Sequence, residues 1–107
     1  MDEKENKNRI ARIADLHHLL HRAVAADNLE MTEFLIGCGA CINLEDHHSR
    51  SPLFHAVKHQ NKSMIQLLSR NGGRVICFHE DLFEIFVDAV KKDDIEFFNL
   101  LYHIEFK

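Results

Sequence analysis

The segment Ser51-Pro52-Leu53-Phe54-His55-Ala56 decides the fold of this 107-residue chain. Pro52 has a fixed φ and no N–H group, which suits the first turn of a helix, and the polar residues from Asp46 to Ser51 are typical of a preceding turn. When the sequence is shifted along itself so that Leu20 falls on Leu53, other apolar positions coincide as well. The aligned sets are Leu20, Leu53 and Phe86, and Ala23, Ala56 and Ala89. A fixed period of this length indicates a stack of helical repeats.

Each period predicts two short helices. The first helix contains the repeated Ala (Ala23, Ala56 or Ala89), at a point where neighbouring backbones come close. The second carries apolar residues at i, i+3 and i+4, which form one buried stripe. These stripes are Met31, Phe34 and Leu35, then Met64, Leu67 and Leu68, then Phe97, Leu100 and Leu101. Gly39 and Gly72 follow the first two stripes, and we expect each to end its helix in a left-handed conformation.

These motifs resemble those of ankyrin repeats. Residues Ser51 to Ala56 are similar to the Thr-Pro-Leu-His-x-Ala signature of that family, and Leu35 to Asn43 are similar to its Leu-Leu-x-x-Gly-Ala-x-Val-Asn. Asp46 stands where the family has the Asp that opens the hairpin finger. The resemblance implies an all-α stack of helix-turn-helix units with short fingers, used to bind another protein without catalysis and without a cofactor.

The resemblance also sets the expected boundaries. We predict a single domain over residues 1–107, with an N-terminal capping helix in 1–15, repeat 1 in 16–48, repeat 2 in 49–81 and a degenerate repeat in 82–107. The cap is expected to use Ile10, Ile13 and Leu16. Several positions depart from the family pattern. Ser49 replaces the Gly of the finger, and Glu105 replaces a terminal Gly. His21 keeps the His of the signature, whereas Phe54 and Val87 replace it in the later repeats. In the third repeat, residues His79 to Phe83 predict an early helix start instead of a finger.

Composition excludes several other classes of protein. The formal net charge is −4, which disfavours nucleic-acid binding, and the apolar runs are too short to span a membrane. Three Cys and no signal-like N-terminus favour reduced thiols and a cytoplasmic location. Adjacent Asp93 and Asp94 are typical of helix capping, and the sequence has no nucleophile elbow or phosphate loop. We therefore expect no enzyme activity.

The Cys-x-x-Cys of Cys38 and Cys41 has two interpretations. It could form a zinc or redox site, with Cys77 and either His47 or His48 completing four zinc ligands. Alternatively, both residues occupy variable positions of the turn that follows a helix, which the repeat register explains without a metal. The second interpretation is favoured, because a redox pair would stand before a helix and this one follows a helix end.

The resemblance implies that partners bind on the concave face, which the family builds from finger tips and the ends of first helices. The corresponding residues here are Leu44, His47, His48, Arg50, Lys58, His59, Lys91 and Lys92. Every titratable group in this set is a base, so an acidic partner is expected.

The C-terminal segment carries an excess of aromatic residues. Six of the eight Phe lie within residues 78–107, and the final helix from Ile95 to Ile104 is apolar on more than one side. One buried stripe takes only about three to four positions per two turns of a helix. We therefore expect some of these side chains to be exposed and to support self-association through the C-terminal repeat.

A second, narrower resemblance concerns the arrangement after residue 51. The repeat that starts at Ser51, the pair Gly72-Gly73 and the helix-like lead-in before Ala89 resemble the ankyrin tail of animal cytosolic asparaginases. This resemblance implies an alternative function, in which the chain is a regulatory or oligomerising tail of an asparaginase-like amidohydrolase.

Overall fold

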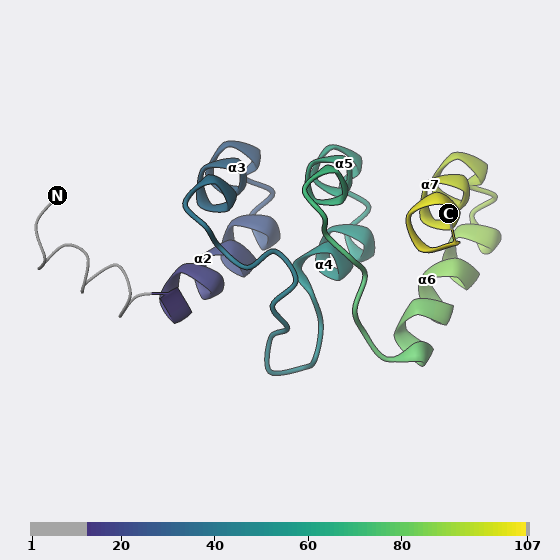
Figure 1. The fold of residues 1–107 in the computed structure, drawn as a ribbon. Coiled ribbons are helices and arrows are strands. Elements are labelled where there is room, and N and C mark those ends of the chain that lie inside the picture. Colours follow the sequence, from purple (N-terminus) through teal and green to yellow (C-terminus); the bar gives the residue numbers. More distant parts are fainter. Residues whose placement is uncertain (1–12, 107) are drawn as a thin grey trace, which may run out of the picture.

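The computed structural model describes residues 13–106, and it describes side chains from His18 to Ile104. The described helices are α2 (Ile13–Ala25), α3 (Leu29–Gly37), α4 (Pro52–Lys58), α5 (Lys62–Arg70), α6 (His79–Lys91) and α7 (Ile95–Phe106), and this part of the chain has no strand. Consecutive helices form three hairpins that stand side by side, with α2, α4 and α6 in one layer and α3, α5 and α7 in the other (Figure 1). The predicted all-α stack of helical hairpins is therefore confirmed. Ile10 of the predicted cap and the side chains of Ile13 and Leu16 lie outside the described residues.

The turn inside each hairpin has the same backbone conformation. Asp27, Gln60 and Asp93, which occupy the same position in successive repeats, all have φ between 54° and 58°. The next N–H group in each turn bonds back to the carbonyl of the repeated Ala at 2.9–3.1 Å; the donors are Asn28, Asn61 and Asp94. These bonds close a left-handed helix end that reverses the chain. In the first and third turns, Oδ1 of Asn28 and of Asp94 also accepts the N–H of the residue three positions later, at 3.0 Å.

Glycine ends the second helix of the first two hairpins, as predicted. Gly39 has φ 98° and Gly72 has φ 86°, a region that favours glycine. Gly73 is required for a different reason. Its N–H bonds to the Leu68 carbonyl at 2.7 Å, and a Cβ at this position would lie only 2.6 Å from that oxygen. In the third hairpin, α7 continues through Glu105, where the terminal Gly is missing.

The core follows the repeat positions, with one correction. The three repeated Ala are buried, and so are Leu35, Leu68 and Leu101. The prediction that Met31 and Phe34 belong to a buried stripe was wrong, because both are exposed. Their equivalents Met64, Leu67 and Phe97 are buried against the preceding hairpin. For Met31 and Phe34 no preceding hairpin exists within residues 13–106.

The third hairpin packs less extensively on the second than the second does on the first. Phe86 and Phe97, which belong to or pack against the core, occupy positions held by smaller residues in the earlier repeats. A cleft of about 350 Å³ lies between α4 and α6 at this junction, and another of about 380 Å³ lies between α5 and α7. α6 begins at His79, which confirms the early helix start, and residues 71–78 run into it without a finger.

We expect Ala56→Leu to destabilise the domain strongly. Ala56 is buried where the first helices approach each other, and overpacking a tight core typically costs about 1–3 kcal/mol. The melting temperature followed by circular dichroism should therefore fall well below that of the unmodified chain. Ala25→Leu adds the same volume at an exposed position of α2 and is the matched control. Equal melting temperatures for the two variants would contradict the close packing at Ala56.

Candidate partner-binding surface

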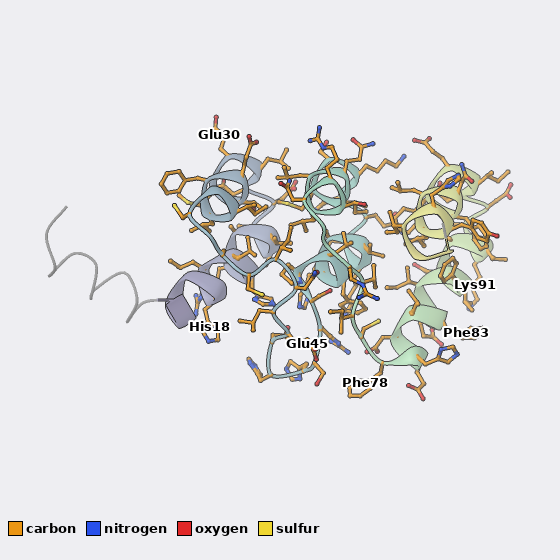
Figure 2. The ribbon with its side chains drawn as sticks, viewed as in Figure 1. His18, Glu30, Glu45, Phe78, Phe83 and Lys91 are labelled. Atoms are coloured by element: carbon orange, nitrogen blue, oxygen red, sulfur yellow. The ribbon has the colours of Figure 1, made fainter. Side chains whose placement is uncertain are left out.

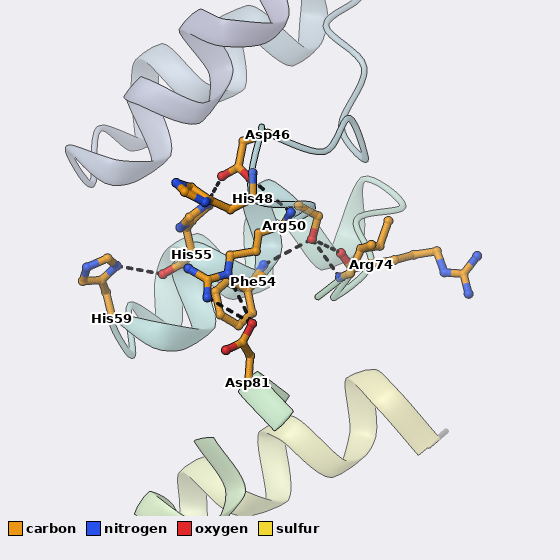
Figure 3. A network of polar contacts seen from close by, with 10 residues as sticks. Asp46, His48, Arg50, Phe54, His55, His59, Arg74 and Asp81 are labelled. Atoms are coloured by element: carbon orange, nitrogen blue, oxygen red, sulfur yellow. Dashed lines mark hydrogen bonds and ion pairs between the residues drawn. The ribbon is translucent and has the colours of Figure 1, made fainter. Parts of the chain in front are cut away.

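The finger between α3 and α4 is organised by the carboxylate of Asp46 (Figure 3). Its Oδ1 accepts the backbone N–H groups of His48 at 2.8 Å and Arg50 at 3.1 Å. The backbone N–H of Asp46 bonds to the Arg50 carbonyl at 3.0 Å, which closes the loop. Ser49, at the position of the family's Gly, adopts φ 60°. One side chain thus fixes a loop whose tip carries exposed residues.

The second oxygen of this carboxylate ties the finger to α4. Asp46 Oδ2 lies 2.7 Å from Nε2 of His55, so that ring nitrogen carries the proton and donates it. Burial alone would raise the pKa of Asp46. The hydrogen bonds from His55 and from the backbone N–H groups of His48 and Arg50 outweigh burial and lower the pKa from 3.8 to about 2. Asp46 is therefore a stable anion in the folded chain.

Ser51 and Asn43 fasten the finger to the segment that follows α5. The buried Ser51 hydroxyl donates to the Arg74 carbonyl at 2.6 Å and accepts the N–H groups of Ile76 and Phe54. The Asn43 side chain donates to the Gly72 carbonyl at 3.0 Å and accepts the N–H of Arg74 at 2.8 Å. The base of the finger is therefore held by a hydrogen-bonded junction between repeats.

Arg50 has internal partners. Its guanidinium donates from Nε and Nη2 to Asp81 Oδ2 at 3.3 and 3.0 Å, and it lies over the Phe54 ring at 5.1 Å from the centroid. The side chain is about three-quarters buried. The structure thus places this predicted contact residue in a bridge from the finger to α6.

The other predicted contact residues are exposed. Leu44, His47 and His48 lie on the finger, where the two His rings are 4.7 Å apart. Lys58 and His59 lie at the end of α4, and His59 Nδ1 donates to the His55 carbonyl at 2.8 Å. Lys91 and Lys92 occupy the equivalent end of α6, which Figure 2 shows for Lys91.

The cleft between α4 and α6 has both signs of charge. Phe54, Val57 and Ile85 form its apolar wall, and Lys58 lies at its rim. Three carboxylates of α6 also line it: Asp81, Glu84 and Asp88. Asp81 pairs with Arg50, and Asp88 pairs with Lys92 at 3.3 Å. The basic set predicted from sequence therefore adjoins an acidic strip at the third repeat.

Sequence reasoning missed four residues of this surface. Asn43 and Ser51 stand at motif positions, but the motif alone did not reveal that they bond to residues 72–76. His55 stands one place beyond the signature His, and Asp81 lies a whole repeat away from Arg50 in the sequence. The opposite charges of Arg50 and Asp81 were the only feature of the sequence that could have suggested this ion pair.

The thiols do not converge on a metal site. Cys38 and Cys41 are exposed after α3, and Cys77 is half-buried in the segment before α6. Within the described residues, no group of three His, Cys, Asp or Glu side chains could hold a metal ion. The four-ligand zinc set considered from sequence is therefore not assembled. Among the described helices none combines the length and apolar character needed to cross a membrane.

Comparison with known proteins gives consistent matches. A family model described as ankyrin repeats in three copies matches residues 13–107. The ADP-ribosylation factor GTPase-activating protein AGD2 of Arabidopsis thaliana is 38% identical over 56 residues, which is 52% of this chain and 7% of that protein. The putative ankyrin repeat protein FPV232 of Fowlpox virus is 32% identical over 83 residues, which is 77% of this chain and 17% of that protein. This chain therefore spans only a small part of the relatives it matches.

We expect the Asp46 network to lose its stabilising effect in acid. The pKa of Asp46 is about 2 in the folded chain and 3.8 without these contacts, so the unfolded chain takes up the proton first as pH falls. The contribution is complete above about pH 4 and amounts to about 2 kcal/mol, by the value of a pKa unit. It disappears as the pH falls through about 2.

Urea denaturation from neutral pH to about pH 2 measures this effect. The free energy of unfolding should fall more steeply for the unmodified chain than for Asp46→Asn, which has no such carboxylate to protonate. Glu45→Gln, at the exposed neighbouring position, should follow the unmodified chain. Parallel curves for the unmodified chain and Asp46→Asn would contradict the assignment.

Proposed function

Since the chain belongs to the ankyrin-repeat family, we propose that it is a non-catalytic, cytoplasmic module that binds another protein through its concave face. The carrying observation is the finger, whose exposed tip residues Leu44, His47 and His48 sit on a base fixed by Asp46 and Ser51. A contact surface held in one conformation pays little conformational entropy on binding.

The charges of this face support a choice of partner chemistry. In a chain of net charge −4, the exposed contact residues that carry a titratable group are all bases: His47, His48, Lys58, His59, Lys91 and Lys92. We propose that they meet an acidic segment of the partner. Arg50 is excluded from this contact set, because its guanidinium is used by Asp81 and Phe54. It acts instead by positioning the finger against α6.

Reversing the charge of Lys58, Lys91 and Lys92 together to Glu should abolish binding of the partner and leave the helicity unchanged. The partner is first isolated with the unmodified domain and identified, and its affinity is then measured with purified proteins. Arg70→Glu reverses an exposed base at the end of α5 in the other helix layer, and it should bind normally. Equal affinity for the triple variant and the unmodified domain would place the interface elsewhere.

A second candidate function is self-association through the third repeat. Val90, Ile95, Phe98 and Tyr102 are exposed together on α6 and α7, and Val90, Ile95 and Phe98 line a hollow of about 280 Å³. Contiguous apolar surface of this kind usually marks an interaction site. We propose that a second copy of this chain covers this surface in solution.

Changing Phe98 and Tyr102 to Ser should weaken self-association of the domain. Sedimentation velocity over a range of concentrations measures the self-association. Circular dichroism establishes that the substituted domain and the unmodified domain are both folded. A domain that is monomeric at millimolar concentration before any substitution would overturn this second candidate.

The alternative of an asparaginase-like tail and that of a zinc or redox module remain predictions of the sequence. An α/β enzyme domain upstream in the same reading frame would support the first. Stoichiometric zinc in the purified protein, lost in a Cys38→Ser, Cys41→Ser variant, would support the second.

A further inference from the structure

Both ends of the stack expose apolar side chains at the positions that the inner repeats use to contact each other. On the side facing the next repeat, Val24 and Val57 are 1% and 0% exposed, whereas the equivalent Val90 is 65% exposed. In the second helices, Thr32 and Ile65 are both 0% exposed, whereas the equivalent Phe98 is 37% exposed. The third repeat thus keeps an apolar contact face with no described repeat against it.

The opposite end shows the same pattern on the side facing the previous repeat. Met64 and Phe97 are fully buried, whereas the equivalent Met31 is 46% exposed. Leu67 is 6% exposed, whereas the equivalent Phe34 is 65% exposed. A terminal repeat normally turns a polar face outward to remain soluble. At the two ends of the described stack the exposed apolar side chains stand instead beside carboxylates, which are Glu30 and Glu33 at one end and Asp93 and Asp94 at the other.

The junction between repeats 2 and 3 identifies which positions meet. Val57 lines the cleft between α4 and α6 together with Ile85. Ile65 and Ser69 line the space between α5 and α7 together with Leu100. The residues of α7 equivalent to Ile65 and Ser69 of α5 are Phe98 and Tyr102. The residue of α3 equivalent to Leu100 of α7 is Phe34. If the same junction formed between the two ends of the stack, Phe34 would therefore meet Phe98 and Tyr102.

We propose that the chain associates head to tail, so that the α6–α7 end of one copy packs on the α2–α3 end of a second copy in the register of the internal repeats. Phe34 of the second copy lies against Phe98 and Tyr102 of the first, and Val90 is covered as Val57 is. The occupant is a second copy because its exposed end carries the residue types that this junction buries in the chain itself.

This inference rests on the self-association proposed above and specifies its geometry. The two faces are different surfaces, so the contact is heterologous. Repeats that add along one axis do not close into a dimer, and the chain should form oligomers that grow with concentration. A C-terminal face that paired with itself would instead stop at a dimer.

Two variants block one face each. Phe34→Lys places a charge on the α2–α3 end, and Val90→Lys places a charge on the α6–α7 end. Both side chains are mostly exposed, so the fold should survive, and circular dichroism checks this. Phe78→Lys is the matched control. Phe78 is 59% exposed but lies before the start of α6, near the finger edge of the molecule (Figure 2).

Sedimentation velocity should find growing oligomers for the unmodified chain and for Phe78→Lys. Each blocked variant alone should be monomeric. An equimolar mixture of the two should form a one-to-one heterodimer and nothing larger, because each variant supplies the face that the other lacks. Recovery of association in the mixture cannot arise from misfolding of either variant.

Three results would overturn the inference. A Phe34→Lys variant that still dimerises alone would show that the α6–α7 face pairs with itself, which keeps the self-association but not this geometry. A blocked pair that stays monomeric when mixed would exclude the head-to-tail contact. An unmodified chain that stays monomeric at millimolar concentration would exclude the association altogether. Binding of the concave-face partner, measured with the same variants, tests the main proposed function separately.

Discussion

No helical hairpin of this chain can bury its apolar side chains by itself, and this constraint governs the rest of the structure. Each hairpin has two apolar sides, and only a neighbouring hairpin covers them. Each described hairpin has a turn with one left-handed residue, which is Asp27, Gln60 or Asp93. Because this turn has the same conformation each time, the two helices of each hairpin have the same relative orientation. Positions that face a neighbouring hairpin are buried, and their equivalents at the two ends of the described stack are exposed.

The finger illustrates how the chain accommodates a departure from its family's motif. Phe54 stands where the signature has His, and it is buried beneath the guanidinium of Arg50. The next residue, His55, reaches the Asp46 carboxylate at 2.7 Å. The carboxylate that holds the loop is therefore still satisfied by an imidazole of the first helix. The exchange adds an aromatic ring to the core without leaving a buried charge unpaired.

Much of the fold could be predicted from sequence because it depends on local rules. The repeat period, the stops at Gly39 and Gly72, and the helix start at Pro52 follow from side-chain size and backbone freedom. The exposure of Met31 and Phe34 could not be predicted in this way, since burial depends on whether a neighbour is present. The roles of Arg50 and Asp81 were equally inaccessible, because an ion pair between positions so distant in the chain requires the relative placement of two repeats.

The missing finger of the third repeat changes the surface that we propose to bind a partner. α6 is 13 residues long and α4 is 7, and the additional residues 79–84 stand where the first finger has residues 46–51. This helical extension supplies Asp81 to Arg50 and adds Glu84 to the cleft. The proposed face thus includes a loop that carries His47 and His48 and a helix that carries carboxylates. A partner segment on the proposed face would therefore have to match both signs of charge: the bases His47, His48, Lys91 and Lys92, and the carboxylates Asp81 and Glu84 of α6.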